Sequence, residues 1–366
     1  MYDLKRNPIL TFEGYTFKFI GDTHFGKRFV RGVPAKYMGY REINMVKEFA
    51  AHLREGAKCD YIVIIGDLFD SIRVSNETLY EIYKVLQSFL NRKTVKAKLI
   101  IIPGNHDLTK DKDKVSSYFI LRTLLNNKFK DHPLFTMVFR EPLLISLDNL
   151  HIYVDAYDPF YEFAPSKGIP LIESISDNIP LLSIGHWDDI RFNTGYVPSD
   201  AIINRSSYLV SGHIHIPSFY TVNNCSVMYV GSMQPYSFGE DPDGLIYRIY
   251  HYSEMDELLK DPQKLKKENL EHTFVRVDCY PGYNIDCWFG YRALLFNPIY
   301  DPPVKKEAAD ETENGLDLSD FNSIFLYTLK TEYDIEDDVL TSLDKFLRGD
   351  EEEFKLSDEL GDVFDE

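Results

Sequence analysis

Strand-like and helix-like segments alternate through the first 130 residues of the chain. Apolar runs predict three buried strands, at 16–21, 60–65 and 98–102. Apolar residues that recur every three or four positions predict three amphipathic helices, at 42–57, 76–90 and 116–127, with Asn76 as the N-cap of the second. Alternation of this kind produces βαβ units, so this part of the chain is expected to form a parallel sheet covered by helices.

The pattern changes after residue 133, where helix signals nearly vanish. Short apolar runs bounded by Asp, Asn, Pro or Gly follow at 135–139, 142–147, 149–155, 180–185, 206–211, 217–222, 226–230 and 244–252. These runs predict a second sheet that packs on the first, so the fold class is α/β.

Beyond residue 253 the segments are mixed. The expected elements are a polar helical stretch at 253–271, strands at 272–279 and 322–329, and a helix at 335–347. They predict a smaller domain at 256–348, after a first domain at 1–255. Residues 349–366 carry dense Asp and Glu and are expected to be disordered, because such a segment cannot bury enough apolar surface.

Composition excludes several classes of protein. A hydrophobic fraction of 44% suffices for a globular core, and the chain has no run of about 18 apolar residues, so no membrane span is expected. The four cysteines lack CxxC spacing. The absence of this spacing excludes a zinc knuckle and a disulfide framework, and the scattered cysteines favour a reducing cytoplasm.

The net charge of −18 is unevenly distributed. Residues 1–130 carry a net +9, residues 131–300 a net −11 and residues 301–366 a net −16. An acidic total disfavours nonspecific binding to a polyanion, whereas the basic first third permits a local phosphate-binding face. The alternative interpretation is a solvated surface with an acidic tail.

Five glycine-led segments carry residues of the kinds that bind metal ions. They are Gly21-Asp22-Thr23-His24, Gly66-Asp67-Leu68-Phe69-Asp70, Gly104-Asn105-His106-Asp107, Gly185-His186 and Gly212-His213-Ile214-His215. Each segment begins where an apolar run ends. Because ligand sites of open α/β sheets form at the carboxyl ends of strands, the five segments are expected to converge. Glycine before each ligand lets the backbone turn sharply and approach closely.

These side chains predict a two-metal site. Asp22 and His24, like His213 and His215, are two positions apart, so in extended backbone each pair is expected to face one ion. Carboxylate, amide oxygen and imidazole suit Mn²⁺, Fe²⁺ or Zn²⁺, and Mg²⁺ less well. Seven ligands are too many for one ion, and with Asp67 as a bridge they serve two ions about 3.5–4 Å apart. The remaining histidines are expected to be structural: His52, His132, His151, His251 and His272.

In their order, the motifs DTH, GDLFD, GNHD, GH and GHIH resemble those of the calcineurin-like metallophosphoesterases, over about residues 15–250. The resemblance implies a four-layer α/β/β/α sandwich with a dinuclear site. It implies a first ion held by Asp22, His24, Asp67 and His215, and a second held by Asp67, Asn105, His186 and His213. It also implies that His106 is the acid–base residue and that Asp70 braces it.

Within that superfamily, GDLFD followed by SIRVSNETLYEIYKVL is similar to the SbcD-type nucleases, as are Val230-Gly231-Ser232 and Ser237-Phe238-Gly239-Glu240. GDLFDS and GNHD fit poorly with the protein Ser/Thr phosphatases. The similarity implies a DNA repair and recombination nuclease subunit, an exonuclease on duplexes and an endonuclease on single strands, with Mn²⁺ as the expected ion. It implies a capping domain at 256–348, an SMC-like coiled-coil ATPase partner or a homodimer, and a cytoplasmic location, the host cytoplasm for a phage protein.

Two other functions remain open at this point. One is a small-substrate phosphodiesterase or phosphomonoesterase, and the other is a non-catalytic interaction scaffold, which is disfavoured because every ligand position is filled. Phosphate positioning requires cations near the ligands. Lys27, Arg28, Arg31 and Arg73 follow the first two motifs and are the candidates, with solvated surface charge as the alternative.

Overall fold

The structure is a computed structural model that describes residues 5–280 and 294–298, apart from 31–32, 34, 36–37, 112–113, 130–131, 156, 161–167, 193–194, 245, 269 and 271–272. The chain divides into two compact units, Met1–Tyr300 and Asp301–Glu366, and all described residues belong to the first. The predicted elements at 322–329 and 335–347, the tail at 349–366, Arg31 and His272 therefore lie outside the described residues. Within the described part, no helix is long and apolar enough to cross a membrane.

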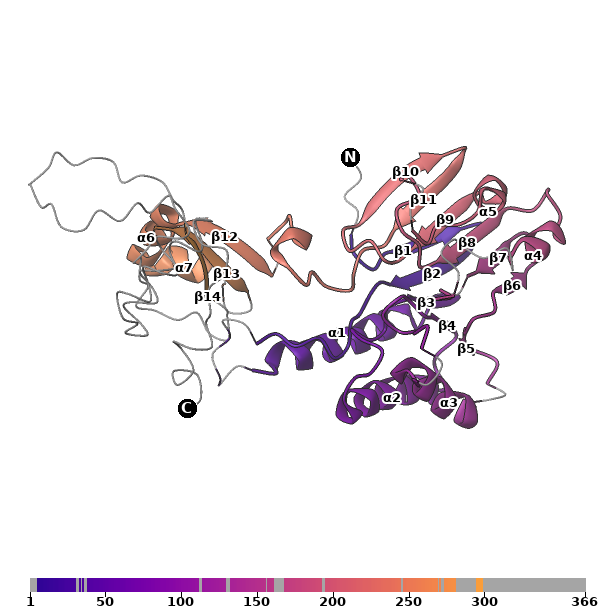
Figure 1. The fold of residues 1–366 in the computed structure, drawn as a ribbon, viewed down its shortest axis with the longest axis horizontal. Coiled ribbons are helices and arrows are strands. Elements are labelled where there is room, and N and C mark those ends of the chain that lie inside the picture. Colours follow the sequence, from indigo (N-terminus) through magenta and orange to yellow (C-terminus); the bar gives the residue numbers. More distant parts are fainter. Residues whose placement is uncertain are drawn as a thin grey trace, which may run out of the picture. The chain divides into compact units, whose positions relative to one another are not determined.

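The first sheet has the predicted parallel strands. Its order is β1 (Ile9–Phe12), β2 (Tyr15–Ile20), β3 (Tyr61–Ile65), β4 (Lys98–Ile102) and β5 (Phe135–Met137). Strands β2 to β5 are parallel, whereas β1, which the apolar pattern does not predict, pairs antiparallel with β2 across a turn at Glu13 and Gly14. The three predicted helices are present as α1 (Tyr40–Gly56), α2 (Asn76–Leu90) and α3 (Ser117–Phe129) (Figure 1).

One capping residue differs from the expectation. The N-cap of α2 is Ser75 rather than Asn76, since the Ser75 hydroxyl accepts a hydrogen bond from the Thr78 amide at 3.2 Å. Serine and asparagine cap equally well, so the pattern could not distinguish adjacent residues.

The second sheet has the order β10 (Ser218–Val222), β11 (Cys225–Tyr229), β9 (Tyr208–Ser211), β8 (Leu181–Gly185), β7 (His151–Val154) and β6 (Leu143–Ser146). Two runs predicted for this sheet belong elsewhere. The run at 135–139 contains β5, which pairs with β4, and the run at 244–252 contains β12 (Tyr247–His251), which pairs with β13 (Phe274–Cys279). Apolar runs predict strands, but they do not identify the partner strand.

A third, smaller sheet joins β12, β13 and β14 (Leu294–Pro298) in parallel. Two helices, α6 (Tyr252–Lys260) and α7 (Pro262–Glu268), connect β12 to β13, as a parallel crossover requires. They agree with the predicted helical stretch at 253–271. The predicted domain boundary after residue 255 stays a prediction.

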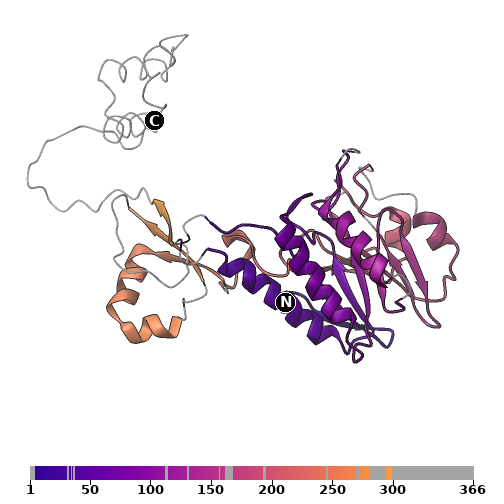
Figure 2. The same ribbon diagram turned by 90° about the horizontal axis from the view of Figure 1, so that it is seen from below.

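Three separate cores hold four layers together. One core lies between α1 to α3 and the first sheet, one between the two sheets, and one between the second sheet and the short helices α4 (Ile169–Glu173) and α5 (Asp200–Arg205). Figure 2 shows α1, α2 and α3 together across one face of the first sheet. In β3, Ile62 and Ile64 belong to the helix-facing core, whereas Val63 and Ile65 belong to the core between the sheets. This alternation confirms the predicted α/β/β/α sandwich.

We expect Phe19→Ala to lower the free energy of unfolding by about 3–5 kcal/mol, because Phe19 is fully buried between the two sheets and its loss leaves a cavity. Urea unfolding followed by circular dichroism measures the change. The matched control is Ile43→Ala on α1, whose side chain is 52% exposed, with an expected change below about 0.5 kcal/mol. Equal changes in the two variants would contradict this assignment of the core.

Candidate metal centre

The five glycine-led segments converge at the carboxyl ends of β2, β3, β4, β8 and β9, as predicted. Two glycines show why the backbone needs them. A Cβ atom on Gly66, which has a φ of +74°, would lie 2.1 Å from the Nδ1 atom of His186. A Cβ atom on Gly104 would lie 2.1 Å from Oδ1 of Asp67. Any larger residue would displace one of these side chains, so the glycines permit the close approach of the loops.

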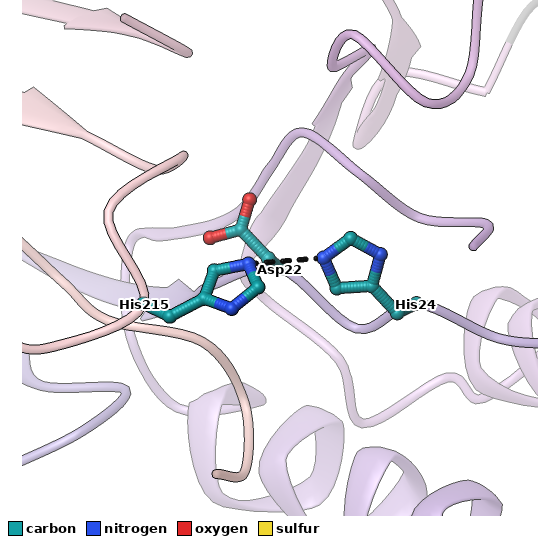
Figure 3. Close-up of side chains that lie close together, drawn as sticks. All are labelled: Asp22, His24 and His215. Atoms are coloured by element: carbon teal, nitrogen blue, oxygen red, sulfur yellow. Dashed lines mark hydrogen bonds between the residues drawn. The ribbon is translucent and has the colours of Figure 1, made fainter. Parts of the chain in front are cut away.

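Asp22, His24 and His215 form the first cluster of candidate ligands. Figure 3 shows the two imidazole rings facing each other, with Asp22 alongside. The Nε2 atoms of His24 and His215 lie 3.1 Å apart, and the Asp22 side chain is completely buried. Two nitrogens that bind one ion through bonds of about 2.0–2.1 Å are separated by about this distance.

Asp67, His186 and His213 form the second cluster, and Asn105 lies against it. The Asn105 Oδ1 atom is 3.0 Å from both His186 Nε2 and His213 Nδ1. Asp67 lies between the two clusters, since its Oδ2 atom is 3.5 Å from His186 Nε2 and 3.8 Å from His24 Nε2. This is the position that a bridging carboxylate requires.

The two histidines of the last motif lie in different clusters. His215 joins the first cluster and His213 the second, which is the division that the family resemblance implies, whereas the expectation from extended backbone that this pair faces one ion is wrong. The reason is the backbone, because His213 has a left-handed φ of 71° and the alternation of side chains in an extended chain no longer applies. His24 and Asp67 also have positive φ, of 45° and 43°. Strained backbone of this kind is concentrated at functional sites.

A carboxylate lies behind each of three imidazole rings, on the nitrogen that faces away from the centre. Asp188 Oδ1 is 2.7 Å from His213 Nε2, Glu240 Oε2 is 3.1 Å from His215 Nδ1, and Asp70 Oδ1 is 3.5 Å from His24 Nδ1. Behind the fourth ring, His186 Nδ1 lies 3.2 Å from the Ile65 carbonyl. Hydrogen-bonding partners fix the orientation of metal-binding histidines, as Asp188 and Glu240 do here, whereas Asp70 is too distant to hydrogen-bond His24 Nδ1.

The protonation of the buried groups suits a cation. Burial lowers the pKa of His24 to about 3, which leaves its imidazole neutral and its lone pair available. Burial, together with the Asp67 carboxylate, raises the pKa of Asp22 well above its usual range. Two buried carboxylates so close together are stabilised when a positive charge lies between them. The donor set of imidazole, carboxylate and amide oxygen therefore fits divalent metal ions.

His106 lies at the exposed side of the centre, with its side chain 43% exposed, and its ring forms a further group of possible donors with His24 and Asp67. Its amide donates a hydrogen bond to Asp67 Oδ1 at 2.9 Å, and its Nδ1 atom lies 2.7 Å from the Asp70 carbonyl oxygen. The predicted bracing by Asp70 is thus made by the main chain. The Asp70 carboxylate instead lies 3.5 Å from Lys27 Nζ and 3.5 Å from His24 Nδ1.

The predicted phosphate-binding cations have different surroundings. Lys27 contacts Asp70, and its ammonium lies 5.7 Å from the centroid of the Tyr236 ring. Arg28 is exposed, and Arg73 is exposed with its Nε 3.5 Å from the Val115 carbonyl oxygen.

Four of the five histidines expected to be structural lie outside the metal clusters: His52, His132, His151 and His251.

Three acidic residues of the site carry no predicted role. Asp107 is completely buried and accepts hydrogen bonds from the amides of Leu68, Phe69 and Gly104 at 2.9–3.0 Å, which joins the loops after β3 and β4. Its place in the GNHD segment is the only signal in the sequence. Asp188 lies two residues after the Gly185-His186 segment, and Glu240 directly follows Gly239. Each carboxylate is 25 residues away in sequence from its histidine partner, His213 for Asp188 and His215 for Glu240, so no local spacing connects them.

Comparison with known proteins identifies a family. The profile of the calcineurin-like phosphoesterases matches residues 15–311. The chain is 25% identical, over 276 residues, to the DNA double-strand break repair protein Mre11 of Archaeoglobus fulgidus, with 68% of this chain and 59% of the relative covered. It is 27% identical, over 287 residues, to the SbcD subunit of the nuclease SbcCD of Staphylococcus epidermidis, with 71% of this chain and 75% of the relative covered.

Among solved structures, a phosphopantetheinyl hydrolase from Mycobacterium tuberculosis is similar with a TM-score of 0.35 and 15% identity. The similarity covers 60% of this chain and 93% of the hydrolase. The chain thus spans a little under three fifths of the Mre11 relative and three quarters of the SbcD relative.

We expect Asp107→Asn to loosen the centre without removing a ligand. The asparagine side chain has only one acceptor oxygen, whereas both oxygens of Asp107 accept hydrogen bonds from backbone amides. In the variant, the NH₂ group would face a backbone N–H group that has then lost its acceptor. The expected losses are about 1–3 kcal/mol in the free energy of unfolding and about 10- to 100-fold in Mn²⁺ affinity. Urea unfolding and isothermal titration calorimetry measure the two effects. The exposed Asp148→Asn is the control, and unchanged Mn²⁺ affinity in Asp107→Asn would refute the assigned role.

Proposed function

Because the chain belongs to the calcineurin-like phosphoesterase family, we propose that it is a metal-dependent nuclease that hydrolyses phosphodiester bonds in DNA. The observation that carries the proposal is the pair of ligand clusters with Asp67 between them. Two relatives named for nuclease and double-strand break repair functions support DNA as the substrate. All seven candidate ligands lie together at one centre, which favours an enzyme over an interaction scaffold.

The proposed centre holds two divalent ions, with Mn²⁺ as the expected metal. The first set of ligands is Asp22, His24, Asp67 and His215, and the second is Asp67, Asn105, His186 and His213. When bound, such ions would neutralise phosphate oxygens and lower the pKa of a water molecule toward about 7. Asp188 and Glu240 orient the imidazoles of His213 and His215, so these ligands keep their geometry when substrate enters.

His106 is the proposed general acid for the leaving oxygen. A carbonyl oxygen only accepts hydrogen bonds, so the Asp70 carbonyl, 2.7 Å away, assigns a proton to Nδ1 of His106. Nε2 is then the atom that exchanges a proton with the substrate. The ring is 43% exposed and lies beside Asp67. A general acid has to be accessible in this way, because it must reach the leaving oxygen of the DNA strand. General acid catalysis of this kind contributes about 10²–10⁴ in rate.

The finer features of the nuclease are also proposals. They are exonuclease activity on duplex ends, endonuclease activity on single strands, and assembly as a homodimer or with an SMC-like ATPase. A capping domain at 256–348 and phosphate contacts by Lys27, Arg28, Arg31 and Arg73 belong to the same proposal. Their support is the similarity to the SbcD relative and Mre11, whose names give nuclease and repair functions.

The function is tested with four substrates in Mn²⁺ and in EDTA. They are end-labelled duplex DNA, single-stranded DNA, bis-p-nitrophenyl phosphate and p-nitrophenyl phosphate. We expect hydrolysis of both DNAs and of the diester in Mn²⁺, and none in EDTA. Hydrolysis of the small esters without cleavage of either DNA would instead identify a small-substrate phosphoesterase.

Two substitutions separate the role of a ligand from that of the acid. We expect Asp67→Asn to lose one or both ions and nearly all activity, whereas His106→Asn keeps its ions and loses about 10²–10⁴ in DNA cleavage. The His106→Asn deficit is expected to shrink on bis-p-nitrophenyl phosphate, because p-nitrophenolate leaves without a proton. Metal content by mass spectrometry and rates on both substrates measure these effects.

The control is His251→Asn, which lies outside the clusters and keeps a side chain that caps α6. It should match the unaltered protein in metal content and rate. If His106→Asn loses metal as completely as Asp67→Asn, then His106 is a ligand and the assignment as acid is wrong.

A further inference from the structure

A row of alternating arginine and phenylalanine side chains lies at the surface between α3 and the loop after β7. We call it the arginine–phenylalanine ladder, and its members are Phe119, Arg122, Phe139, Arg140 and Phe160. The guanidinium carbons of Arg122 and Arg140 lie 5.2 Å and 5.1 Å from the Phe139 ring centroid. Arg140 also lies 5.4 Å from the Phe160 ring, and the Phe119 and Phe139 rings are 5.5 Å apart.

The ladder is open to solvent. Phe160 is 44% exposed, Phe119 is 39% exposed, and Arg140 is exposed as well. Large aromatic rings are normally buried in a core, and here they share the surface with cations. One exposed carboxylate, Glu141, follows Arg140 in the chain.

Both ends of the ladder connect to the segments that carry the candidate ligands. At the α3 end, the Ser117 amide donates to the Ile72 carbonyl at 2.8 Å, two residues after Asp70. Arg122 Nε donates to the Met137 carbonyl at 3.2 Å, which attaches α3 to the end of β5.

At the other end, Phe160 follows Tyr157, whose ring lies 4.9 Å from that of Tyr196. The Tyr196 amide donates to Asp188 at 2.6 Å, and Asp188 contacts His213. The loops after β5 and β7 leave the same edge of their sheets as the ligand loops, because β5 runs parallel to β4 and β7 runs parallel to β8. The ladder therefore lies at the edge of the sheets where the metal centre is formed.

We propose that the arginine–phenylalanine ladder binds single-stranded DNA and guides it to the metal centre, an inference that rests on the proposed nuclease function. Aromatic rings stack on bases of any sequence, and guanidinium groups contact the phosphates between them. A duplex hides its base faces, so the exposed rings select unpaired strands. The cations of the ladder are Arg122 and Arg140, whereas the chain as a whole has a net charge of −18.

Binding to two labelled strands in EDTA tests the proposal without cleavage. One strand is oligo(dT), and the other is an abasic strand of equal length. By fluorescence anisotropy, we expect Phe160→Ala to weaken oligo(dT) binding about five- to tenfold and to leave abasic binding unchanged, because only bases stack. Arg140→Gln is expected to weaken both, because both strands carry phosphates. Phe160→Trp restores a stacking ring and should retain the affinity for oligo(dT).

The matched control is Tyr80→Ala on α2. Tyr80 is 60% exposed and also has a cation beside it, with Lys84 Nζ 5.4 Å from its ring, but it is not part of the ladder. This variant should bind both strands normally. Phe160→Ala should hydrolyse bis-p-nitrophenyl phosphate as fast as the unaltered protein, which excludes damage to the metal centre.

Two results would overturn the proposal. One is unchanged oligo(dT) binding in Phe160→Ala, and the other is a change in oligomeric state by light scattering without a change in DNA affinity, which would identify a protein interface. Failure of the nuclease function gives a different result, namely no cleavage of DNA in Mn²⁺ by the unaltered protein. The binding and cleavage measurements therefore distinguish the two failures.

Discussion

Two buried carboxylates share one small space, and the rest of the centre depends on this. Asp22 is completely buried and Asp67 is 2% exposed, and five imidazoles surround them. In a medium of low polarity such charges are costly unless cations or hydrogen-bond donors compensate them. The His213 amide donates to Asp22 and the His106 amide donates to Asp67. The remaining negative charge suits the binding of divalent metal ions.

The loops around these carboxylates are held by the fold rather than by their own preferences. Three residues, His24, Asp67 and His213, have left-handed backbone that such side chains rarely adopt. The buried Asp107 fixes two of the loops through three backbone amides, and parallel strands on both sheets place all five loops at one edge. The four-layer packing thus compensates for local strain at the centre.

Local charge and net charge have different consequences in this protein. The whole chain is acidic, yet the first 130 residues are basic and contribute most of the ligand loops. The arginine–phenylalanine ladder adds cations and exposed rings at the same edge of the sheets. A polyanion would therefore encounter favourable groups at the centre, even though the molecule as a whole repels it.

Much of the architecture and the ligand set was determined by the sequence itself. Amphipathic periodicity predicted α1 to α3, and apolar runs predicted β2 to β4, within about two residues, since both patterns are local properties of the sequence. The glycine-led motifs identified all seven candidate ligands, because metal binding requires particular donor atoms.

The tertiary structure alone decided the partners. Strand β5 joined the first sheet and β12 the third, since pairing depends on residues far apart in the chain. The family motifs implied that His213 and His215 serve different ions, and the positive φ of His213 supplies the physical reason. Asp188 and Glu240 acquired their roles, and Phe139, Arg140 and Phe160 came together, only through contacts between distant segments. Such contacts leave no spacing in a single sequence, and this is why no local pattern could predict them.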